Sequence, residues 1–423
     1  MITEMNAFSF ATHSLQDARV LRILQAALDA VEPGAAVRKA LADRPLPNAE
    51  RIFGLSIGKA ALPMLDALTG LIPLESGLAI HKHASSPSPS LYSVMEGGHP
   101  VPDKRSLAAG GAALNFVSQL TPDDLLICLI SGGGSALMTA PLVPLEDLRA
   151  LTSALLACGA RIDEINILRR HLDRVKGGGL VRAANGARIL SLILSDVVGD
   201  PLEAIASGPT APDPTTCEDA RAVLQKYKLN VPASIMLALE ETLKPGDALF
   251  SRVENKIIAS NEIAARAALT QAEREGFQVD LLTTHLQGEA REVGFSLASK
   301  LRVGKILHPY CLIAGGETTV TLCNNPGRGG RNQELALAAV PVLAGMKDAM
   351  LISLATDGED GPTDAAGAVV TGESAHRAES LGLDAAASQS RNDAYSFFAA
   401  LDDLIRIGPT GTNVNDLVLM FAL

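Results

Sequence analysis

The chain has 423 residues, of which 47% are hydrophobic and 20% charged, and its formal net charge is -11. This length predicts two or three domains with sizeable cores, while the negative charge and the few aromatic residues argue against a nucleic-acid partner. The five cysteines are widely spaced and form no CxxC pair, which excludes the usual zinc and disulfide patterns. No secretory signal is visible at the N-terminus, so we expect a soluble, cytoplasmic protein with no membrane partner.

Strand and helix patterns alternate through the first part of the chain. In chain order we predict helix 14–31, strand 51–57, helix 58–68, strand 77–81, loops 85–89 and 97–102, helix 106–120, strand 125–130, helices 145–158 and 162–175, strand 188–194, and helices 218–227 and 233–243. This alternation is typical of a doubly wound α/β sheet.

A turn at residues 245–247 is a predicted hinge, after which the alternation starts again. The patterns that follow are strand 256–259, helix 262–275, strand 279–283, helix 289–301, strands 311–314 and 318–322, helix 332–340, strands 350–354 and 368–370, helix 391–401 and strand 416–421. We therefore predict two three-layer α/β/α domains, residues 1–245 and 246–423, with doubly wound parallel or mixed sheets and an active-site cleft between them. Ligands in such sheets bind beyond the carboxyl ends of strands.

Lys59 lies where the strand at 51–57 turns into a helix. The sequence around it resembles a phosphate loop, but only three residues separate the glycines, and Ala60 offers no hydroxyl for Mg²⁺. A lysine at a helix start opposes the helix dipole, which favours an anion-binding role over a solvated lysine.

A second glycine loop follows the buried strand at 125–130 and consists of Ser131, Gly132, Gly133, Gly134 and Ser135. Its successive N–H groups can form a nest for a phosphate or carboxylate, and the alternative is a tight turn without a ligand. The loop lacks the GxGxxG spacing, so a dinucleotide gets little support.

Five cations, Arg169, Arg170, His171, Arg174 and Lys176, precede three glycines. They form either a solvated helix face or part of a cleft lining. Further on, Asp196 and Asp200 follow the strand at 188–194. They are candidates to hold Mg²⁺, and Asp196 is also a candidate to take a proton from a substrate hydroxyl; the alternative is a capping aspartate.

The glycine loop 327–331 carries Arg328 and Arg331 to the start of a helix, whose free N–H groups favour anions. Arginine binds carboxylate and phosphate through two donors, so we interpret this loop as a site for an acidic, phosphorylated small molecule rather than a solvated turn. Glu317, after the strand at 311–314, is a candidate for metal or nucleotide binding.

The stretch 356–364 contains four carboxylates, Asp357 and Asp360 among them, which repel one another unless cations neutralise them. A metal–nucleotide role and a solvated acidic loop are both open. Asn413 lies in a polar turn, 411–416, that could reach the same place.

Nine stretches in order resemble a known family: SIGKAA (56–61), GGHPVPD (97–103), SGGGSAL (131–137), VKGGGL (175–180), LSDVVGDPLEAIASGPT (194–210), GGETTVT (315–321), GRGGRNQE (327–334), ATDGEDGPTDAAGA (355–368) and GTNVND (411–416). They are similar to bacterial and archaeal two-domain glycerate 2-kinases, many of which are named hydroxypyruvate reductase. The C-terminal part of this family is the MOFRL domain, here about 305–420, although the motif behind that name is not present verbatim.

The resemblance implies ATP-dependent phosphorylation of D-glycerate to 2-phosphoglycerate with Mg²⁺. The catalytic lysine of the family falls on Lys59 and its key arginine on Arg331, and Asp196 matches an acidic position for substrate or base. Expected partners are D-glycerate and ATP, with a homodimer as a candidate assembly.

Three alternatives stay open at this point. They are an NAD(P)H-dependent hydroxypyruvate reductase, a glycerate kinase that phosphorylates the 3-hydroxyl, and a non-catalytic binding protein for sugar acids. The reductase is disfavoured because no GxGxxG with a following acidic residue is present.

Overall fold

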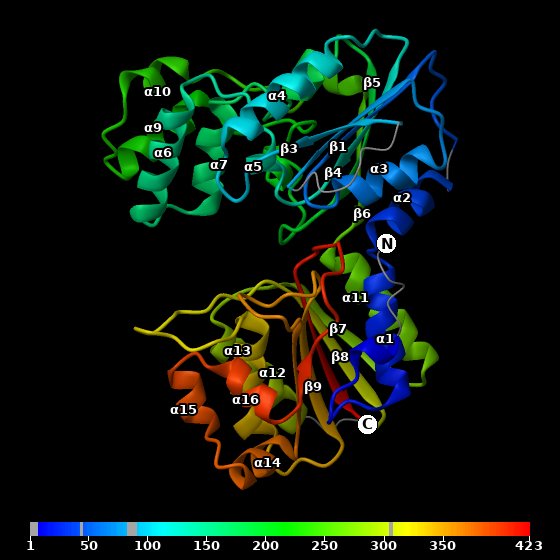
Figure 1. The fold of residues 1–423 in the computed structure, drawn as a ribbon, viewed down its shortest axis with the longest axis vertical. Coiled ribbons are helices and arrows are strands. Elements are labelled where there is room, and N and C mark those ends of the chain that lie inside the picture. The colour runs from blue at the N-terminus through cyan, green and yellow to red at the C-terminus, as the bar shows by residue number, and fades with distance from the viewer. Residues whose placement is uncertain (1–6, 43–44, 83–90, 304–307) are drawn as a thin grey trace. The chain divides into compact units, whose positions relative to one another are not determined.

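The computed structural model describes residues 7–42, 45–82, 91–303 and 308–423, and the predicted loop at 85–89 lies outside these residues (Figure 1). The chain divides into two compact units. Pro33–Ile258 form one of them, here called the parallel-sheet unit. Met1–Glu32 and Ala259–Leu423 form the other, here called the mixed-sheet unit.

The parallel-sheet unit is built on a six-stranded sheet in the order β3-β2-β1-β4-β5-β6. Its strands are β1 (Ile52–Ile57), β2 (Ser76–His81), β3 (Ser93–Glu96), β4 (Leu125–Ile130), β5 (Arg188–Leu194) and β6 (Val253–Ala259). Strands β1 to β5 pair in parallel. Every residue of β4 is buried, which is why its sequence is an unbroken apolar run.

Helices cover both faces of this sheet, and β1 is buried from Phe53 to Ile57. Phe53, Leu55 and Ile57 pack with helix α4 in one core. On the other face Gly54 leaves room for Leu65 of helix α3, since a Cβ at Gly54 would lie 3.0 Å from the Leu65 side chain. The helices of this unit are α2 (Pro33–Ala42), α3 (Ala61–Thr69), α4 (Lys104–Val117), α5 (Gly134–Leu137), α6 (Leu145–Ala157), α7 (Ile162–His171), α8 (Gly179–Ala183), α9 (Cys217–Lys226) and α10 (Ala233–Ala238), with short 3-10 turns η2 (Ile205–Ser207) and η3 (Ala248–Arg252). A separate small core joins α6, α7, α9 and α10.

The mixed-sheet unit has six strands in the order β11-β10-β9-β12-β8-β7. They are β7 (Gln278–Leu286), β8 (Tyr310–Gly316), β9 (Ala349–Ala355), β10 (Gly367–Thr371), β11 (Leu404–Ile405) and β12 (Asp416–Ala422). β7 and β8 pair in parallel, and the remaining pairs are antiparallel. The central strand β12 is buried along its whole length.

Helices also cover both faces of the mixed sheet, and Figure 1 shows α12, α13 and α16 on one face and α1 with α11 on the other. The bounds are η1 (Ala7–Phe10), α1 (Ala18–Asp29), α11 (Asn261–Arg274), α12 (Ala290–Val303), α13 (Arg331–Leu343), α14 (Ser374–Ser380), α15 (Ala385–Ser390) and α16 (Ala394–Ala400). The predicted α/β class with two sheets is confirmed.

The two units differ from the predicted division at residue 245 in two ways. Strand β6 continues the parallel sheet after the turn at Gly246, so that unit runs to Ile258. Helix α1 buries one apolar face, including Leu24 and Leu28, and packs against α11, so the N-terminal segment belongs to the mixed-sheet unit. Removing this apolar face from water is the physical reason for the discontinuous unit.

The predicted strand at 318–322 is wrong. Thr319 forms only an isolated bridge to Glu289, and Thr321 donates through its N–H and its hydroxyl to the Glu289 carboxylate. These hydrogen bonds to a side chain take the place of the strand-to-strand hydrogen bonds that were expected for this segment. Within the described residues, no helix combines the length and the apolar character needed to cross a membrane.

Candidate functional site

The first group of candidate residues lies at the carboxyl edge of the parallel sheet. The strand order reverses between β1 and β4, and Ile57 and Ile130 are paired in register, so the loops after these strands lie side by side at the switch point. The N–H of Lys59 donates to the carbonyl oxygen of Gly132 at 2.9 Å. Lys59 is exposed, so its ammonium group is accessible at this edge.

Ser131 fastens the two loops to each other. Its buried hydroxyl donates to the carbonyl oxygen of Ile57 at 3.2 Å and accepts from the N–H of Ala60 at 3.0 Å. The predicted ligand-binding side chain at Ser131 is thus used within the protein. Gly134 opens α5, whose first N–H groups lack intrahelical acceptors, so any anion nest here consists of backbone donors.

Asp196 lies against the same glycine loop. A Cβ added to Gly132 would be 2.0 Å from Oδ2 of Asp196, so only glycine leaves room for the carboxylate. Burial raises the pKa of Asp196, and the positive charge of Lys59 partly offsets this effect. A carboxyl group with a raised pKa beside a lysine at a strand end is suited to proton transfer.

The other predicted residues of this unit are placed differently. Ser135 and Ser207 share a hydrogen bond of 2.8 Å between their hydroxyl groups, which joins α5 to η2. Asp200 has φ 55° and is half-buried, and its carboxylate makes no hydrogen bond or ion pair with another described residue. Among the described residues, neither Asp196 nor Asp200 belongs to a group of three or more side chains placed to hold a metal ion.

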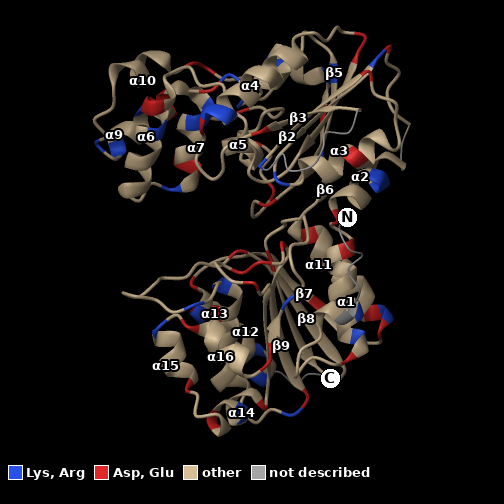
Figure 2. Ribbon diagram, viewed as in Figure 1, with Lys and Arg blue, Asp and Glu red and all other residues tan. Residues whose placement is uncertain are grey.

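The second group of candidates lies at one edge of the mixed sheet, where Figure 2 shows acidic positions on the loops. Arg331 begins α13 and binds Asp416, the first residue of β12, with Nε–Oδ2 and Nη2–Oδ1 distances of 2.5 and 3.1 Å. Its Nη1 lies 2.8 Å from the Glu317 carboxylate. Burial opposes the charge of Arg331, but the hydrogen bond to Asp416 and the nearby acids outweigh it and raise the pKa of the guanidinium.

Asp360 occupies the N-terminus of α13. Its carboxylate accepts from the N–H groups of Asn332 and Gln333 at 3.1 and 2.9 Å, and the residue is 1% exposed. Burial raises the pKa of Asp360 to about 7, against the opposing effect of these N–H groups. A carboxylate of the protein itself therefore occupies these two N–H groups, and they are not free for a ligand anion.

The remaining predicted residues of this unit have local partners. Arg328 is exposed, and its guanidinium lies 4.1 Å from the ring centre of Tyr395. Asp357 accepts from the N–H of Glu359 at 3.1 Å, and Asn413 accepts from the N–H of Asn415 at 3.0 Å. The Thr356 hydroxyl, which donates to the Asn415 carbonyl oxygen at 2.7 Å, ties these two loops together.

Comparison with known proteins places this arrangement in a family. A D-glycerate 2-kinase of Thermotoga maritima is 40% identical over 94% of this chain and 96% of its own, and a glycerate 2-kinase of Pyrococcus horikoshii is 38% identical over the same shares. The chain belongs to the glycerate kinase family. A family model described as a domain of unknown function (DUF4147) matches residues 19–240, and the MOFRL family matches 310–416.

The crystal structure of the Thermotoga maritima glycerate kinase covers 95% of this chain and 98% of that chain, with a TM-score of 0.89 and 39% identity. A protein of Agrobacterium vitis named putative hydroxypyruvate reductase is 39% identical over 94% of this chain and 92% of its own. The resemblance to the glycerate kinase family that the nine motifs predict is thus confirmed.

Two residues near the candidate sites of this glycerate kinase family member were not predicted from the sequence. The His99 ring lies against the Lys59 loop, because a Cβ at Gly133 would be 3.2 Å from His99 Nε2 and 3.3 Å from Lys59 Cγ. Burial, with Lys59 and Lys82, lowers the pKa of His99. Asp416 is the second missed residue. Both residues lie in stretches that carry the family resemblance, and that resemblance is the sequence signal from which they could have been found.

The cations after residue 168 are mostly structural. Arg170 Nε lies 3.0 Å from the buried carboxylate of Asp213, and the His171 Nε2 atom lies 3.5 Å from the same group. Lys176 is buried and paired with Asp173. Of the five, Arg169 has no carboxylate partner among the described residues, and Arg174 is exposed.

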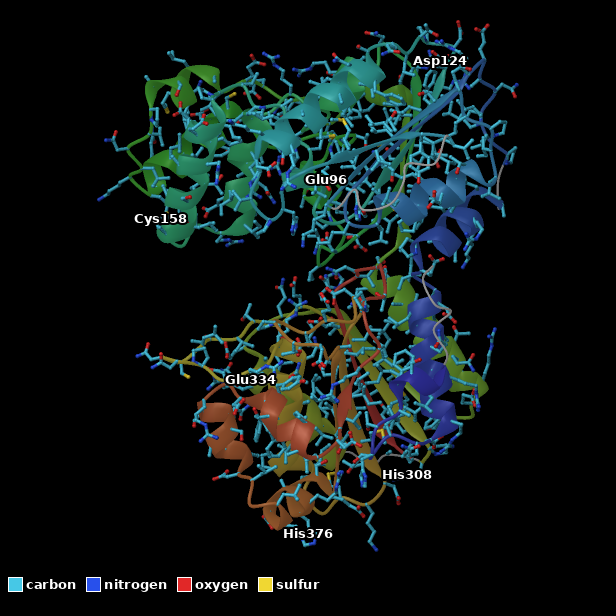
Figure 3. All side chains as sticks on the ribbon, in the orientation of Figure 1. Glu96, Asp124, Cys158, His308, Glu334 and His376 are labelled. Carbon is cyan, nitrogen blue, oxygen red and sulfur yellow. The ribbon has the colours of Figure 1, made fainter. Side chains whose placement is uncertain are left out.

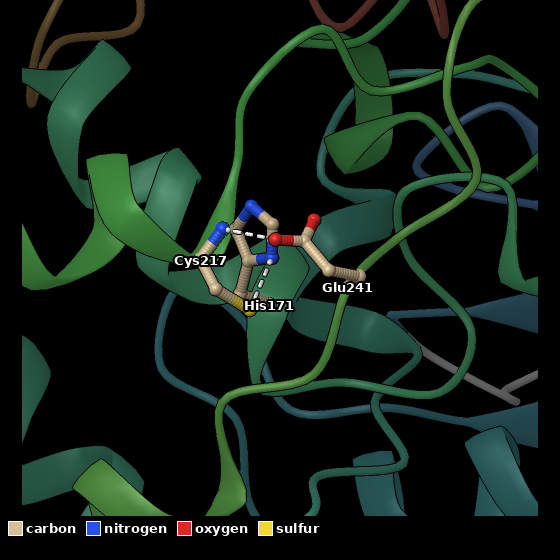
Figure 4. Close-up of side chains that lie close together, drawn as sticks. All are labelled: His171, Cys217 and Glu241. Carbon is tan, nitrogen blue, oxygen red and sulfur yellow. Dashed lines mark hydrogen bonds between the residues drawn. The ribbon is translucent and has the colours of Figure 1, made fainter.

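His171, Cys217 and Glu241 form the one three-residue group in the described chain whose ligand atoms are close enough for a metal, within 4.8 Å (Figure 4). The Nδ1 atom of His171 is 2.8 Å from the Glu240 carbonyl oxygen and must donate to it. Glu241 accepts from the N–H of Cys217 and pairs with Lys244, both at 2.8 Å. These atoms are engaged within the protein, so the group is a structural network.

Proposed function

We propose that the protein is an ATP-dependent kinase that phosphorylates D-glycerate to 2-phosphoglycerate. The observation that carries this proposal is the placement of Lys59 beside Asp196 at the switch point of the parallel sheet, in a chain about as long as its glycerate 2-kinase relatives. Phosphoryl transfer depends on positioning and charge neutralisation, and this edge offers a lysine, a carboxylate and backbone donors.

In this proposal the 2-hydroxyl oxygen of glycerate attacks the γ-phosphorus of ATP, and the bond from phosphorus to the β–γ bridging oxygen breaks to release ADP. Asp196 orients the hydroxyl and takes its proton, for which a carboxyl group with a raised pKa is suited. Lys59 neutralises the charge on the transferred phosphoryl group. The N–H groups of Gly132, Gly133 and Gly134 hold phosphate or carboxylate oxygens.

Arg331 serves, we propose, as the anion-binding residue of the mixed-sheet unit. Its side chain is 32% exposed despite two acidic partners, so the guanidinium keeps an accessible surface. Glu317, Asp357 and Asn413 at the same edge are the candidates for contacts to the nucleotide. Asp360 and Arg328 contribute indirectly, since their side chains are used at the start of α13 and on Tyr395.

As the alternative to its role as proton acceptor, Asp196 fits together with Asp200 the preference of Mg²⁺ for one or two carboxylates combined with phosphate oxygens. Asp200 supports this role because its carboxylate is not engaged by any described residue. A bound Mg²⁺ would supply charge neutralisation for the ATP phosphates. For the assembly we keep the prediction of a homodimer, which light scattering can check.

A paired assay on the purified protein tests the proposal. One arm supplies D-glycerate, ATP and Mg²⁺ and follows ADP release and the phosphoglycerate isomer; the other supplies hydroxypyruvate with NADH or NADPH and follows nicotinamide absorbance. We expect glycerate-dependent ADP release with 2-phosphoglycerate as product. The 3-isomer would correct the regiochemistry, and cofactor oxidation without ADP release would replace the kinase with a reductase.

A further inference from the structure

Arg169 carries a positive charge that no described residue neutralises. It lies on α7 and is half-buried, and its one hydrogen bond among the described residues is from Nη1 to Oδ1 of Asn166 at 3.4 Å. The neighbouring Arg170, in contrast, is paired with the buried carboxylate of Asp213 at 3.0 Å. Burial lowers the pKa of the Arg169 guanidinium. An unpaired charge is costly away from water, so the site needs a counter-charge.

A second cation next to Arg169 makes this need stronger. The buried Lys176 ammonium donates to the carbonyl oxygen of Met138 at 3.4 Å and pairs with Asp173. Burial lowers the pKa of Lys176, and the positive charge of Arg169 lowers it further although Asp173 opposes the change. The positive charges of Arg169 and Lys176 thus oppose each other. Asp173 is already bound to Lys176.

The residues around Arg169 are linked by contacts to the glycine loop of the candidate site. Met138, which Lys176 contacts, ends the short helix α5 that begins at Gly134. The loop before Ser207 rests on α7, since Arg170 donates to the Glu203 carbonyl oxygen at 3.2 Å, and Ser207 in turn is bonded to Ser135. One path therefore leads from Lys176 to the end of α5, and the other leads from Arg170, next to Arg169, to Ser135 of the loop at 131–135, within the parallel-sheet unit.

We propose that the Arg169 guanidinium binds an oxyanion of the reactants, either the carboxylate of the acceptor or a phosphate of the donor. The inference rests on the proposed kinase function and adds a specificity-determining residue to it. The planar guanidinium presents two parallel donors, which match both groups. The anion supplies the counter-charge that this side chain lacks in the free protein.

Three substitutions test this role. Arg169→Met removes the charge and keeps most of the side-chain volume, whereas Arg169→Lys keeps the charge but loses the two parallel donors. Arg174→Met, at an exposed neighbour, is the control. We expect Arg169→Met to raise KM for D-glycerate or for ATP by about 10- to 100-fold, the effect of a lost charge-assisted hydrogen bond. A rise for glycerate alone identifies the carboxylate, and a rise for ATP alone identifies a phosphate.

Melting temperatures of the free proteins separate binding from a structural role. Arg169→Met should melt no lower than wild type, because it removes an uncompensated charge, whereas Arg170→Met should melt lower because the buried carboxylate of Asp213 loses its arginine partner. A loss of stability in both Arg169 variants, or unchanged KM values for both reactants, would overturn the inference.

Shifts in melting temperature on addition of a ligand test the inference independently of the proposed function. D-glycerate, ATP and inorganic phosphate are added separately to wild type and to Arg169→Met, without any turnover. A shift in wild type that is lost in the variant supports the inference even if no kinase activity is found. An active wild type whose shifts and KM values survive the substitution refutes the inference alone.

Discussion

The Arg331 guanidinium and the Asp416 carboxylate form two hydrogen bonds, of 2.5 and 3.1 Å, between the first residue of α13 and the first residue of β12. The third nitrogen of the guanidinium faces Glu317, which follows β8. Because β8 and β12 are neighbouring strands, these contacts hold the arginine at one edge of the sheet. The geometry explains how a side chain in a glycine-rich loop acquires a fixed position.

Asp416→Asn should impair both stability and turnover. Asn can still accept one hydrogen bond from Arg331 but leaves the guanidinium without its buried counter-charge, so we expect a loss of about 1–3 kcal/mol in the free energy of unfolding. Urea titration measures this loss, and steady-state assays should show a lower kcat. Asp364→Asn is the control, since Asp364 is 63% exposed and should contribute little. Equal behaviour of the two variants would argue against a positioning role.

Gly132→Ala should displace Asp196. The new Cβ would lie 2.0 Å from Asp196 Oδ2, far inside van der Waals contact, so the carboxylate must move. We expect kcat to fall by about 10²-fold, the size of effect that a misplaced catalytic group produces. Gly111→Ala in α4 is the matched control, because nothing lies within 4 Å of its added Cβ and alanine favours a helix by about 1 kcal/mol. Unchanged kcat in a folded Gly132→Ala protein would remove Asp196 from the mechanism.

Lys59→Met should remove transition-state charge stabilisation and lower kcat/KM by about 10²- to 10³-fold. Lys104→Met, on the exposed start of α4, should leave it unchanged. A second readout does not depend on turnover. Lys59 is one cause of the lowered pKa of His99, so its removal should raise the His99 pKa in an NMR titration, although burial, the larger cause, keeps it depressed. No change would mean that His99 and Lys59 are not neighbours.

The parallel sheet was predictable to a large extent from its sequence. β4 and β5 begin and end at the predicted residues, because unbroken apolar runs stopped by loop residues have few alternatives. The helix α1 was also predicted, but its partner was not. The apolar face of α1 could pack against any other apolar helix face or sheet, and only the structure shows that it packs against α11.

The candidate site was predictable in part. Lys59 and Asp196 follow different strands, and their meeting depends on the strand order, which no local pattern contains. The role of Asp360 was missed for a similar reason. From the sequence alone, an acidic loop suggests a ligand site. Only the structure shows that Asp360 instead accepts from N–H groups of α13, about 30 residues away.

Glu334→Gln should change how stability depends on pH. Glu334 lies on α13, labelled in Figure 3, and is 2% exposed, with Arg291 at 3.7 Å and Asn392 at 3.3 Å. Burial raises the pKa of Glu334 from its ordinary value of 4.5 to about 7, although Arg291 opposes the shift. The folded state therefore holds a proton that the unfolded state has already released between these two values.

The sign of the effect follows from this raised pKa. Stability due to the protonated carboxyl is complete below pH 4.5 and is lost as the pH rises through about 7. Glutamine does not titrate, so the free energy of unfolding of the variant relative to wild type should increase by about 1–3 kcal/mol between pH 5 and pH 8. Asp360 also has a raised pKa, but it titrates in both proteins and cancels in the difference.

Urea unfolding at a series of pH values measures this difference. Glu273→Gln, an exposed glutamate on α11, is the control and should give a flat difference across the same range. Because the comparison uses the difference between two proteins at each pH, general effects of pH on the fold drop out. A flat difference for Glu334→Gln as well would mean that Arg291 and Asn392 keep the carboxylate ionised in the folded protein, and that burial is not the dominant influence on it.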